Sequence, residues 1–273
     1  MHVAIITRQI GHYHDARYRG AVNALGDITV LSVANEGGFA EFLARDLGSY
    51  RVERVFDNRG SYDASKSCGG VHQAVQAKLN VIDPEVVAVA GWASAESFSA
   101  IEWANRNRRG LIMMSESQDF DARRIAPREF LKSRVVGACH AALVGGPSHR
   151  DYIIKLGMPA ERVFFGYNAV GNMHFMSGAN AARAEAAKKR AANGLPDRYI
   201  LASARFIEKK NLPALVSAYG KALDAVEIAP DLVILGDGPM RPALVDAINR
   251  QGIQQRVHLP GFRSYDLLPT YYG

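Results

Sequence analysis

Short apolar segments alternate with helical segments along most of this chain, and this alternation constrains the fold more than any other feature. The apolar segments are nearly continuous runs of Val, Ile, Leu and Ala, which is typical of strands covered on both faces. In the first 165 residues we expect strands at Val3–Thr7, Ile28–Val33, Val52–Phe56, Val86–Ala90, Leu111–Met114, Ala141–Val144 and Val163–Phe165. Between them we expect helices at Asp15–Leu25, Phe39–Leu47, Lys66–Leu79, Ala95–Arg106, Pro127–Val136 and Pro147–Leu156. The alternation predicts an α/β fold with parallel strands.

A turn-rich segment, Gly166–Asn172, is expected to end a first domain. We predict an N-terminal Rossmann-like domain over residues 1–172, a linker helix within 173–197 and a second, incomplete Rossmann-like domain over 198–273. The linker helix is expected to run from Met176 to Gly194. In the second domain we expect strands at Ile200–Ala202, Leu232–Leu235 and Val257–Leu259, and helices at Leu212–Val226, Pro242–Gln251 and Ser264–Tyr272.

Composition excludes several classes of protein. Hydrophobic residues make up 48% of the chain and charged residues 22%, and no apolar run reaches the ~18 residues of a membrane span. The two cysteines, Cys68 and Cys139, have no metal-binding or redox spacing, which favours free thiols in a reducing cytoplasm. The net charge of +6 is accompanied by no nucleic-acid-binding signature, so we expect no nucleic-acid partner.

The segment from Tyr199 to Gly238 carries the clearest sign of chemistry. An apolar strand is followed by a turn that holds Arg205, Lys209 and Lys210, and a helix is expected to start near Leu212. A second apolar strand ends in Gly-Asp-Gly-Pro at residues 236–239. Cations that follow a parallel strand and precede a helix suit a phosphate or pyrophosphate group.

This run resembles the nucleotide-sugar half of retaining glycosyltransferases with the GT-B fold, glycosyltransferase family 4, also called group 1. Arg205 and Lys210 have the spacing of the family's Arg-Leu-x-x-x-Lys-Gly/Asn pattern, Asn211 follows, and the Gly-Asp-Gly-Pro turn falls in step. Residues 152–175 resemble the family's crossing between domains, with Gly171 where the family usually has Asp. The resemblance implies two Rossmann-like domains that face each other across a cleft.

The resemblance also implies roles for residues of the second domain. Arg205 and Lys210 would bind the donor pyrophosphate and stabilise the leaving group during catalysis. The turn residues Gly236, Asp237 and Gly238 would contact the donor, although a purely structural turn explains them equally well. Candidates for contact with the nucleotide base are Gly261, Phe262 and Arg263, and Phe262 has a core role as its alternative. We expect no metal and no cofactor beyond the nucleotide-sugar substrate.

In the first domain the match is partial. Gly11 stands in the loop that, in the family, approaches the donor and acceptor. His12 and His14 there could serve the acceptor side by acid–base chemistry or hydrogen bonding, or could cap the next helix. Asp15 is most simply the first-turn acid of that helix. Glu116 could assist catalysis by hydrogen bonding to a sugar, or belong to a helix-capping Ser-Glu-Ser. Trp92 could stack on an acceptor sugar or be buried.

A basic run suggests a further partner. The run consists of Arg123, Arg124, Arg128, Lys132 and Arg134. These side chains could bind an acidic or lipid-linked acceptor, lie on an anionic membrane surface, or form a solvated face. The expected location is therefore the cytoplasm, with the inner face of the membrane as a second option.

The predicted activity is transfer of a sugar from a nucleotide-sugar to an acceptor hydroxyl with retention, in polysaccharide or glycolipid synthesis. The family's later Glu-x7-Glu motif has no counterpart, because Asp266 is the only acid after Gly261. The sequence therefore suggests a C-terminally truncated relative, and an inactive binding or partner-dependent module is the alternative. An epimerase or a phosphorylase of the same fold is a further alternative.

Overall fold

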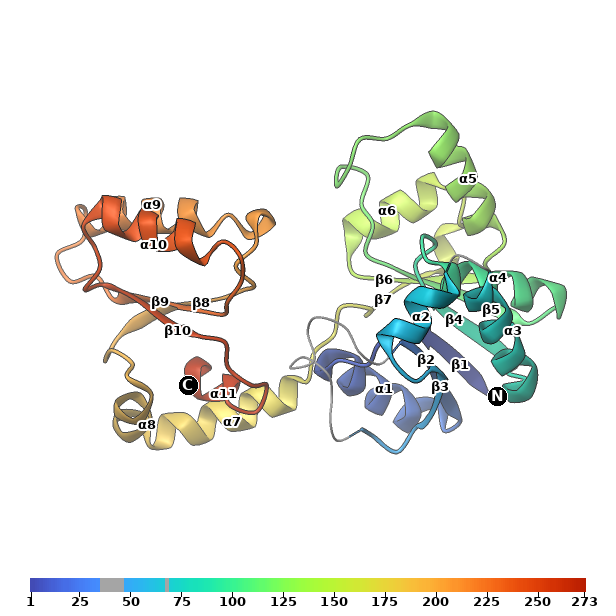
Figure 1. Ribbon diagram of the computed structural model, residues 1–273, viewed down its shortest axis with the longest axis horizontal. Helices are drawn as coiled ribbons and strands as arrows, with labels where there is room; N and C mark the ends of the chain where they lie inside the picture. Colours follow the sequence, from blue (N-terminus) through green and yellow to red (C-terminus); the bar gives the residue numbers. More distant parts are fainter. Residues whose placement is uncertain (35–46, 67–68) are drawn as a thin grey trace. The chain divides into compact units, whose positions relative to one another are not determined.

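A parallel sheet forms the centre of the first unit of the computed structural model (Figure 1), which describes residues 1–34, 47–66 and 69–273. In this described part, the chain divides into Met1–Gly171 and Asn172–Gly273. The first sheet has the described strands in the order β3-β2-β1-β4-β5-β6-β7, all parallel. Their bounds are β1 Val3–Thr7, β2 Ile28–Ala34, β3 Arg51–Phe56, β4 Val86–Ala90, β5 Gly110–Ser115, β6 Ala141–Val144 and β7 Val163–Phe165.

Helices cover both faces of this sheet because its strands present apolar side chains in both directions. Ala4 and Ile6 of β1 belong to one buried cluster, whereas Val3 and Ile5 belong to another that includes Tyr18 of α1. The first cluster receives side chains from the remaining helices of the unit. The described helices are α1 His12–Leu25, α2 Arg59–Ser65, α3 Gly70–Ile82, α4 Ala95–Arg106, α5 Ala126–Gly137 and α6 Pro147–Lys155.

Two predicted helices of this unit are wrong at their starts, and the one expected from Asp15 begins at His12. The expected helix Lys66–Leu79 begins only at Gly70, and a separate α2 precedes it. Asn58 begins α2 by accepting the Ser61 N–H at 2.9 Å, and Gly69 at φ +68° precedes α3. The expected helix Phe39–Leu47 lies, apart from Leu47, outside the described residues.

The second unit is built on a smaller parallel sheet. Within residues 172–273, all described, the strand order is β10-β9-β8, with β8 Tyr199–Ser203, β9 Asp231–Leu235 and β10 Val257–Gly261. Helices α9 (Leu212–Leu223) and α10 (Arg241–Gln251) pack on one face of this sheet (Figure 1). The other face meets Leu195 and Tyr271, the latter from α11 (Leu268–Tyr272).

The expected single linker helix is instead two helices. The first, α7, spans Asn172–Ala184, and the second, α8, spans Ala186–Asn193. They separate at Glu185, whose backbone leaves the helical region at φ −122° and ψ 32°. Gly194 ends α8 in the left-handed conformation at φ +63°, as predicted from the Gly-x-Pro sequence.

Candidate functional site

Three loops lie at the carboxyl ends of β8, β9 and β10, and backbone hydrogen bonds join them. The Ala204 N–H donates to the Leu235 carbonyl at 3.0 Å, and the Phe206 N–H donates to the Asp237 carbonyl at 2.8 Å. On the other side, the Gly236 N–H donates to the Gly261 carbonyl at 3.1 Å. The predicted donor-binding residues of the second domain therefore lie on adjoining loops at the carboxyl ends of the strands.

Gly236 and Gly238 allow two of these loops to approach closely. Gly236 has φ +127°, and a Cβ placed there would lie 1.9 Å from the Ala204 carbonyl oxygen. Gly238 has φ +152°, and its added Cβ would lie 2.6 Å from the Phe206 carbonyl oxygen. The positive φ and the close approach of the backbone explain why glycine occupies both positions. Their contact with a donor stays a prediction.

Arg205 and Lys210 are exposed on the segment between β8 and α9. The two neighbours of Arg205, Ala204 and Phe206, are both fixed by their hydrogen bonds to the end of β9 and the loop after it. The carbonyl of buried Phe206 also accepts the Met240 N–H at 2.9 Å. Lys210 ends a short 3-10 turn, and Asn211 then takes φ +48° before α9 begins. The left-handed conformation explains why Gly or Asn suits this position.

Asp237 is held by its own turn. Its Oδ1 accepts the Gly238 N–H at 2.8 Å, and its Oδ2 lies 3.7 Å from Nη1 of Arg241. Arg241 also donates through Nη2 to the Leu259 carbonyl at 3.3 Å, in β10. The carboxylate therefore orients the turn and the start of α10, which is a sufficient structural role for it.

Arg263 points toward α11. Its Nε donates to the Tyr271 hydroxyl at 2.6 Å, and its Nη1 donates to the Phe262 carbonyl at 2.9 Å. Phe262 is partly buried. The proposed contact of Arg263 with a base would require its guanidinium to leave Tyr271 or to use the remaining N–H groups.

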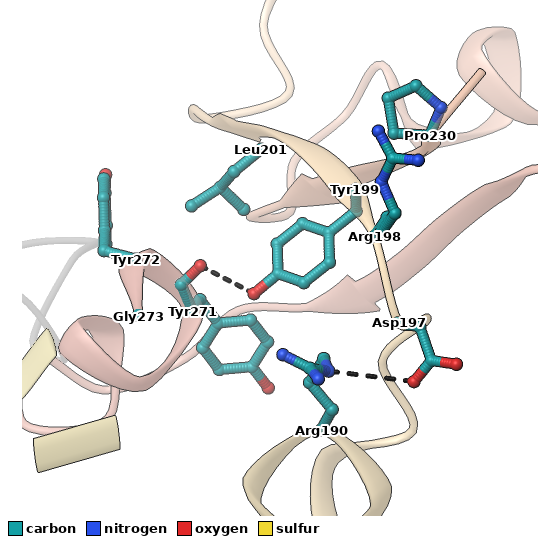
Figure 2. A pocket seen from close by; sticks show the side chains of 9 residues that line it. All are labelled: Arg190, Asp197, Arg198, Tyr199, Leu201, Pro230, Tyr271, Tyr272 and Gly273. Atoms are coloured by element: carbon teal, nitrogen blue, oxygen red, sulfur yellow. Dashed lines mark hydrogen bonds and ion pairs between the residues drawn. The ribbon is translucent and has the colours of Figure 1, made fainter. Parts of the chain in front are cut away.

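A cavity of about 560 Å³ lies elsewhere in this unit, beside the amino ends of β8 and β9. Figure 2 shows the Tyr199 hydroxyl directed at the Tyr271 carbonyl, which it meets at 2.8 Å, and Arg190 facing Asp197 at 3.9 Å. Arg198 and Pro230 line the same space. This cavity is therefore separate from the predicted donor residues, which follow the opposite ends of the same strands.

In the first unit, the loop after β1 is fixed to the start of α1. The Gly11 N–H donates to Nδ1 of His14 at 3.1 Å, which confirms the capping alternative for His14. Burial, with a smaller effect of the Arg17 charge, lowers the pKa of His14 to about 4, so this ring is neutral at neutral pH. His12 is the first residue of α1, and its role toward an acceptor stays a prediction.

Asp15 does more than provide a negative charge to the first turn. Its buried carboxylate accepts the Tyr50 hydroxyl at 2.7 Å and the Gly48 N–H at 2.9 Å, and Arg19 Nε lies at 2.6 Å. The expectation of a simple first-turn acid was too narrow, because Asp15 joins α1 to the segment before β3. Arg19 is a local partner within α1, but Gly48 and Tyr50 lie more than thirty residues away, beyond any local sequence pattern.

Sequence reasoning missed a second buried carboxylate, Glu96 at the start of α4. Glu96 is 3% exposed, and its Oε1 accepts from Arg8 Nε at 3.0 Å and Arg8 Nη2 at 2.9 Å. Its Oε2 accepts the Tyr62 hydroxyl at 3.1 Å. This carboxylate ties the loop after β1 to α2 and α4, and holds a half-exposed guanidinium at the carboxyl end of β1.

Glu116 and Trp92 follow neighbouring strands β5 and β4. Glu116 is exposed, and its charge adds to the effect of burial in raising the pKa of Tyr167, which Arg17 opposes. No helix begins between Ser115 and Ala126, all of which are described, so the helix-capping alternative for Glu116 is wrong. Trp92 is partly buried and meets the Tyr152 ring edge-on at 6.3 Å between centroids.

Two negative findings concern the described residues alone. None of their helices is both long and apolar enough to cross a membrane. Among the same residues, no three His, Cys, Asp or Glu side chains gather in an arrangement that could hold a metal ion.

A known protein family matches the part of the chain that contains these three loops. Residues 184–273 match the family model described as Glycosyl transferases group 1, which supports a glycosyltransferase. That match contains the three loops at the carboxyl ends of β8, β9 and β10. No curated protein matches the chain in sequence.

Solved structures share the fold over nearly the whole chain. HepE from Anabaena, in complex with UDP and glucose, has a TM-score of 0.65 at 16% identity, covering 99% of this chain and 71% of that one. The UDP-GlcNAc 2-epimerase from Neisseria meningitidis, bound to UDP-GlcNAc, has a TM-score of 0.61 at 13% identity, covering 100% and 74%. The lipopolysaccharide outer core galactosyltransferase WaaB, in its apo form, has a TM-score of 0.59 at 14% identity, covering 97% and 69%.

The chain has the fold of GT-B glycosyltransferases and epimerases. This confirms the predicted fold class, with a larger parallel sheet followed by a smaller one. Since every one of these structures is less than 25% identical to the chain, their ligands describe those proteins only.

Proposed function

We propose that this protein is a retaining glycosyltransferase that moves a sugar from a nucleotide-sugar donor to an acceptor hydroxyl. The observation that carries the proposal is the group 1 match over residues 184–273, in which Arg205 and Lys210 precede the Gly-Asp-Gly turn on adjoining loops. A uridine diphosphate sugar is the proposed donor, because UDP or UDP-GlcNAc is bound in two of the structures that share the fold. The proposed acceptor is a growing polysaccharide or a glycolipid.

In this proposal, charge stabilisation drives the reaction. As the acceptor oxygen bonds to the anomeric carbon of the sugar, the bond from that carbon to the diphosphate breaks and its electron pair leaves with the diphosphate, on whose oxygens negative charge builds. The proton of the acceptor hydroxyl passes to the departing diphosphate or to solvent. Arg205 offers forked hydrogen bonds and Lys210 a mobile ammonium group, and both stabilise this charge as it develops. Gly236, Gly238 and Gly261 of the second unit allow backbone to approach the donor. In the first unit, Glu116 hydrogen-bonds a hydroxyl of the acceptor.

Nucleoside-diphosphate binding tests the two cations. We expect Arg205→Ala and Lys210→Ala each to weaken UDP binding by about tenfold or more, since a hydrogen bond to a charged group contributes about 1.5–3 kcal/mol. Isothermal titration calorimetry measures this directly. Arg198→Ala is the matched control, because this exposed arginine precedes β8 at the opposite edge of the sheet. Unchanged affinity in both test variants would overturn the assignment.

Epimerisation is the second candidate, because a UDP-GlcNAc 2-epimerase shares the fold at a similar TM-score. Incubating the protein with UDP-GlcNAc and no acceptor separates the two activities. Formation of the 2-epimer would favour the epimerase, whereas slow release of the sugar with UDP would favour the transferase. Tight UDP binding with neither reaction would favour the binding module.

A further inference from the structure

The outward face of α5 carries apolar side chains that the fold of the first unit leaves uncovered. Phe130 is 66% exposed and Leu131 is 63% exposed, on consecutive positions of the helix. Ile125, the N-cap residue that precedes α5, is 41% exposed. Helix α5 lies beside α6 within the first unit (Figure 1), and its buried side is marked by Val136.

Two exposed arginines share this face. Arg134 stands four positions after Phe130 and three after Leu131, and Arg128 stands three before Leu131, so each adjoins an apolar side chain along the helix. Among the described residues, neither arginine has an ion-pair or hydrogen-bond partner on its side chain. We call the set Ile125, Arg128, Phe130, Leu131 and Arg134 the α5 patch.

The nearby acids Asp121 and Glu129 do not neutralise the patch, because each is engaged with a cation outside it. Glu129 Oε1 accepts from Lys132 Nζ at 2.7 Å, and Glu129 Oε2 accepts the Tyr152 hydroxyl at 2.7 Å. Asp121 pairs with Arg124, whose guanidinium carbon lies 4.4 Å from the Tyr152 ring centroid. These contacts fix the helix to α6 and leave positive charge and apolar surface pointing outward.

We propose that the α5 patch docks the protein on an anionic lipid bilayer. Exposed Phe and Leu next to unpaired Arg is the combination that binds at the headgroup boundary, where the apolar side chains enter the acyl region and the cations meet lipid phosphates. The basic run in the sequence indicated the charge, and the structure adds the exposed apolar side chains between the arginines. This inference does not depend on which sugar reaction the protein performs.

Vesicle sedimentation tests the inference on the full chain. Vesicles of phosphatidylcholine with one third phosphatidylglycerol are compared with vesicles of phosphatidylcholine alone. We expect the wild-type protein to bind the anionic vesicles at least tenfold better. The variants Phe130→Ser with Leu131→Ser, and Arg128→Ala with Arg134→Ala, are each expected to lose about tenfold or more in this binding.

Matched controls remove similar groups elsewhere. Val81→Ser and Ile228→Ser replace side chains that are 85% and 74% exposed, and Arg162→Ala with Arg198→Ala removes two exposed charges. We expect vesicle binding of these controls to stay at the wild-type level. Far-UV circular dichroism and thermal unfolding are recorded for every variant to show that the α5 variants are folded, and UDP titration on the same variants shows whether vesicle binding is a separate property.

Two outcomes would overturn the proposal. In the first, wild-type protein ignores anionic vesicles, or loses binding equally in the α5 and control variants. In the second, the wild type self-associates in analytical ultracentrifugation and Phe130→Ser with Leu131→Ser abolishes this association without changing vesicle binding. That result would assign the patch to a contact between two copies of the chain.

Discussion

At the scale of single residues, Gly236 shows how little freedom the loop after β9 has. An alanine Cβ there would lie 1.9 Å from the Ala204 carbonyl oxygen, in a backbone conformation at φ +127° that alanine disfavours. We expect Gly236→Ala to lower the free energy of unfolding by about 2–4 kcal/mol, measured by urea denaturation. Gly252→Ala is the control. Gly252 also has a positive φ of +67°, but its added Cβ meets nothing within 4 Å, so we expect the free energy of unfolding of this variant to fall by only about 1 kcal/mol. Equal losses in the two variants would show that the close approach has no energetic weight.

At the scale of an element, the capping residue His14 at the start of α1 predicts that the stability of the protein depends on pH. The pKa of His14 is about 4 in the folded protein, against 6.5 as its ordinary value. The unfolded chain therefore takes up this proton first, so stability from neutral His14 is complete above pH 6.5 and is lost as the pH falls toward 4. His14→Gln keeps a capping side chain but does not titrate. Between pH 7.5 and pH 5 we expect the wild type to lose about 1–2 kcal/mol more than His14→Gln in urea denaturation. Parallel pH profiles would contradict this assignment.

At the scale of the whole molecule, the buried clusters fall into two sets, one in each unit of the described chain. Leu79 and Ile234 are both 0% exposed, the first in α3 and the second in β9. We expect Leu79→Ala and Ile234→Ala each to cost about 2–5 kcal/mol, and calorimetry to show two transitions of which each variant lowers one. The shift per kcal/mol is expected to be larger for the smaller second unit. A single transition that both variants lower equally would contradict independent cores.

Much of the fold follows from the sequence because the strands are continuous apolar runs. The predicted bounds of Val3–Thr7 and Ala141–Val144 match the structure for this reason. Helix α2 was missed because its seven residues, Arg59–Ser65, bury only Tyr62 and so lack an apolar period.

For the candidate site, sequence order was enough to predict that Arg205, Asp237 and Gly261 lie at or just after the carboxyl ends of three parallel strands. The long-range contacts of Asp15 and Glu96 were beyond prediction, because their partners Tyr50, Tyr62 and Arg8 come from distant segments. Spacing along a chain specifies which residues lie on one loop, but it does not specify which loops bond to each other.

The hydrogen bonds that join the loops after β8, β9 and β10 have a consequence for protein engineering. Because each loop supplies a bond that fixes its neighbour, lengthening one loop would displace the other two. Substitutions of exposed side chains on these loops, such as that of Lys209, should therefore be tolerated more readily than changes of loop length. A library that varies these side chains and keeps every backbone length should retain folded members, whereas a library of loop insertions should mostly yield protein that fails to accumulate.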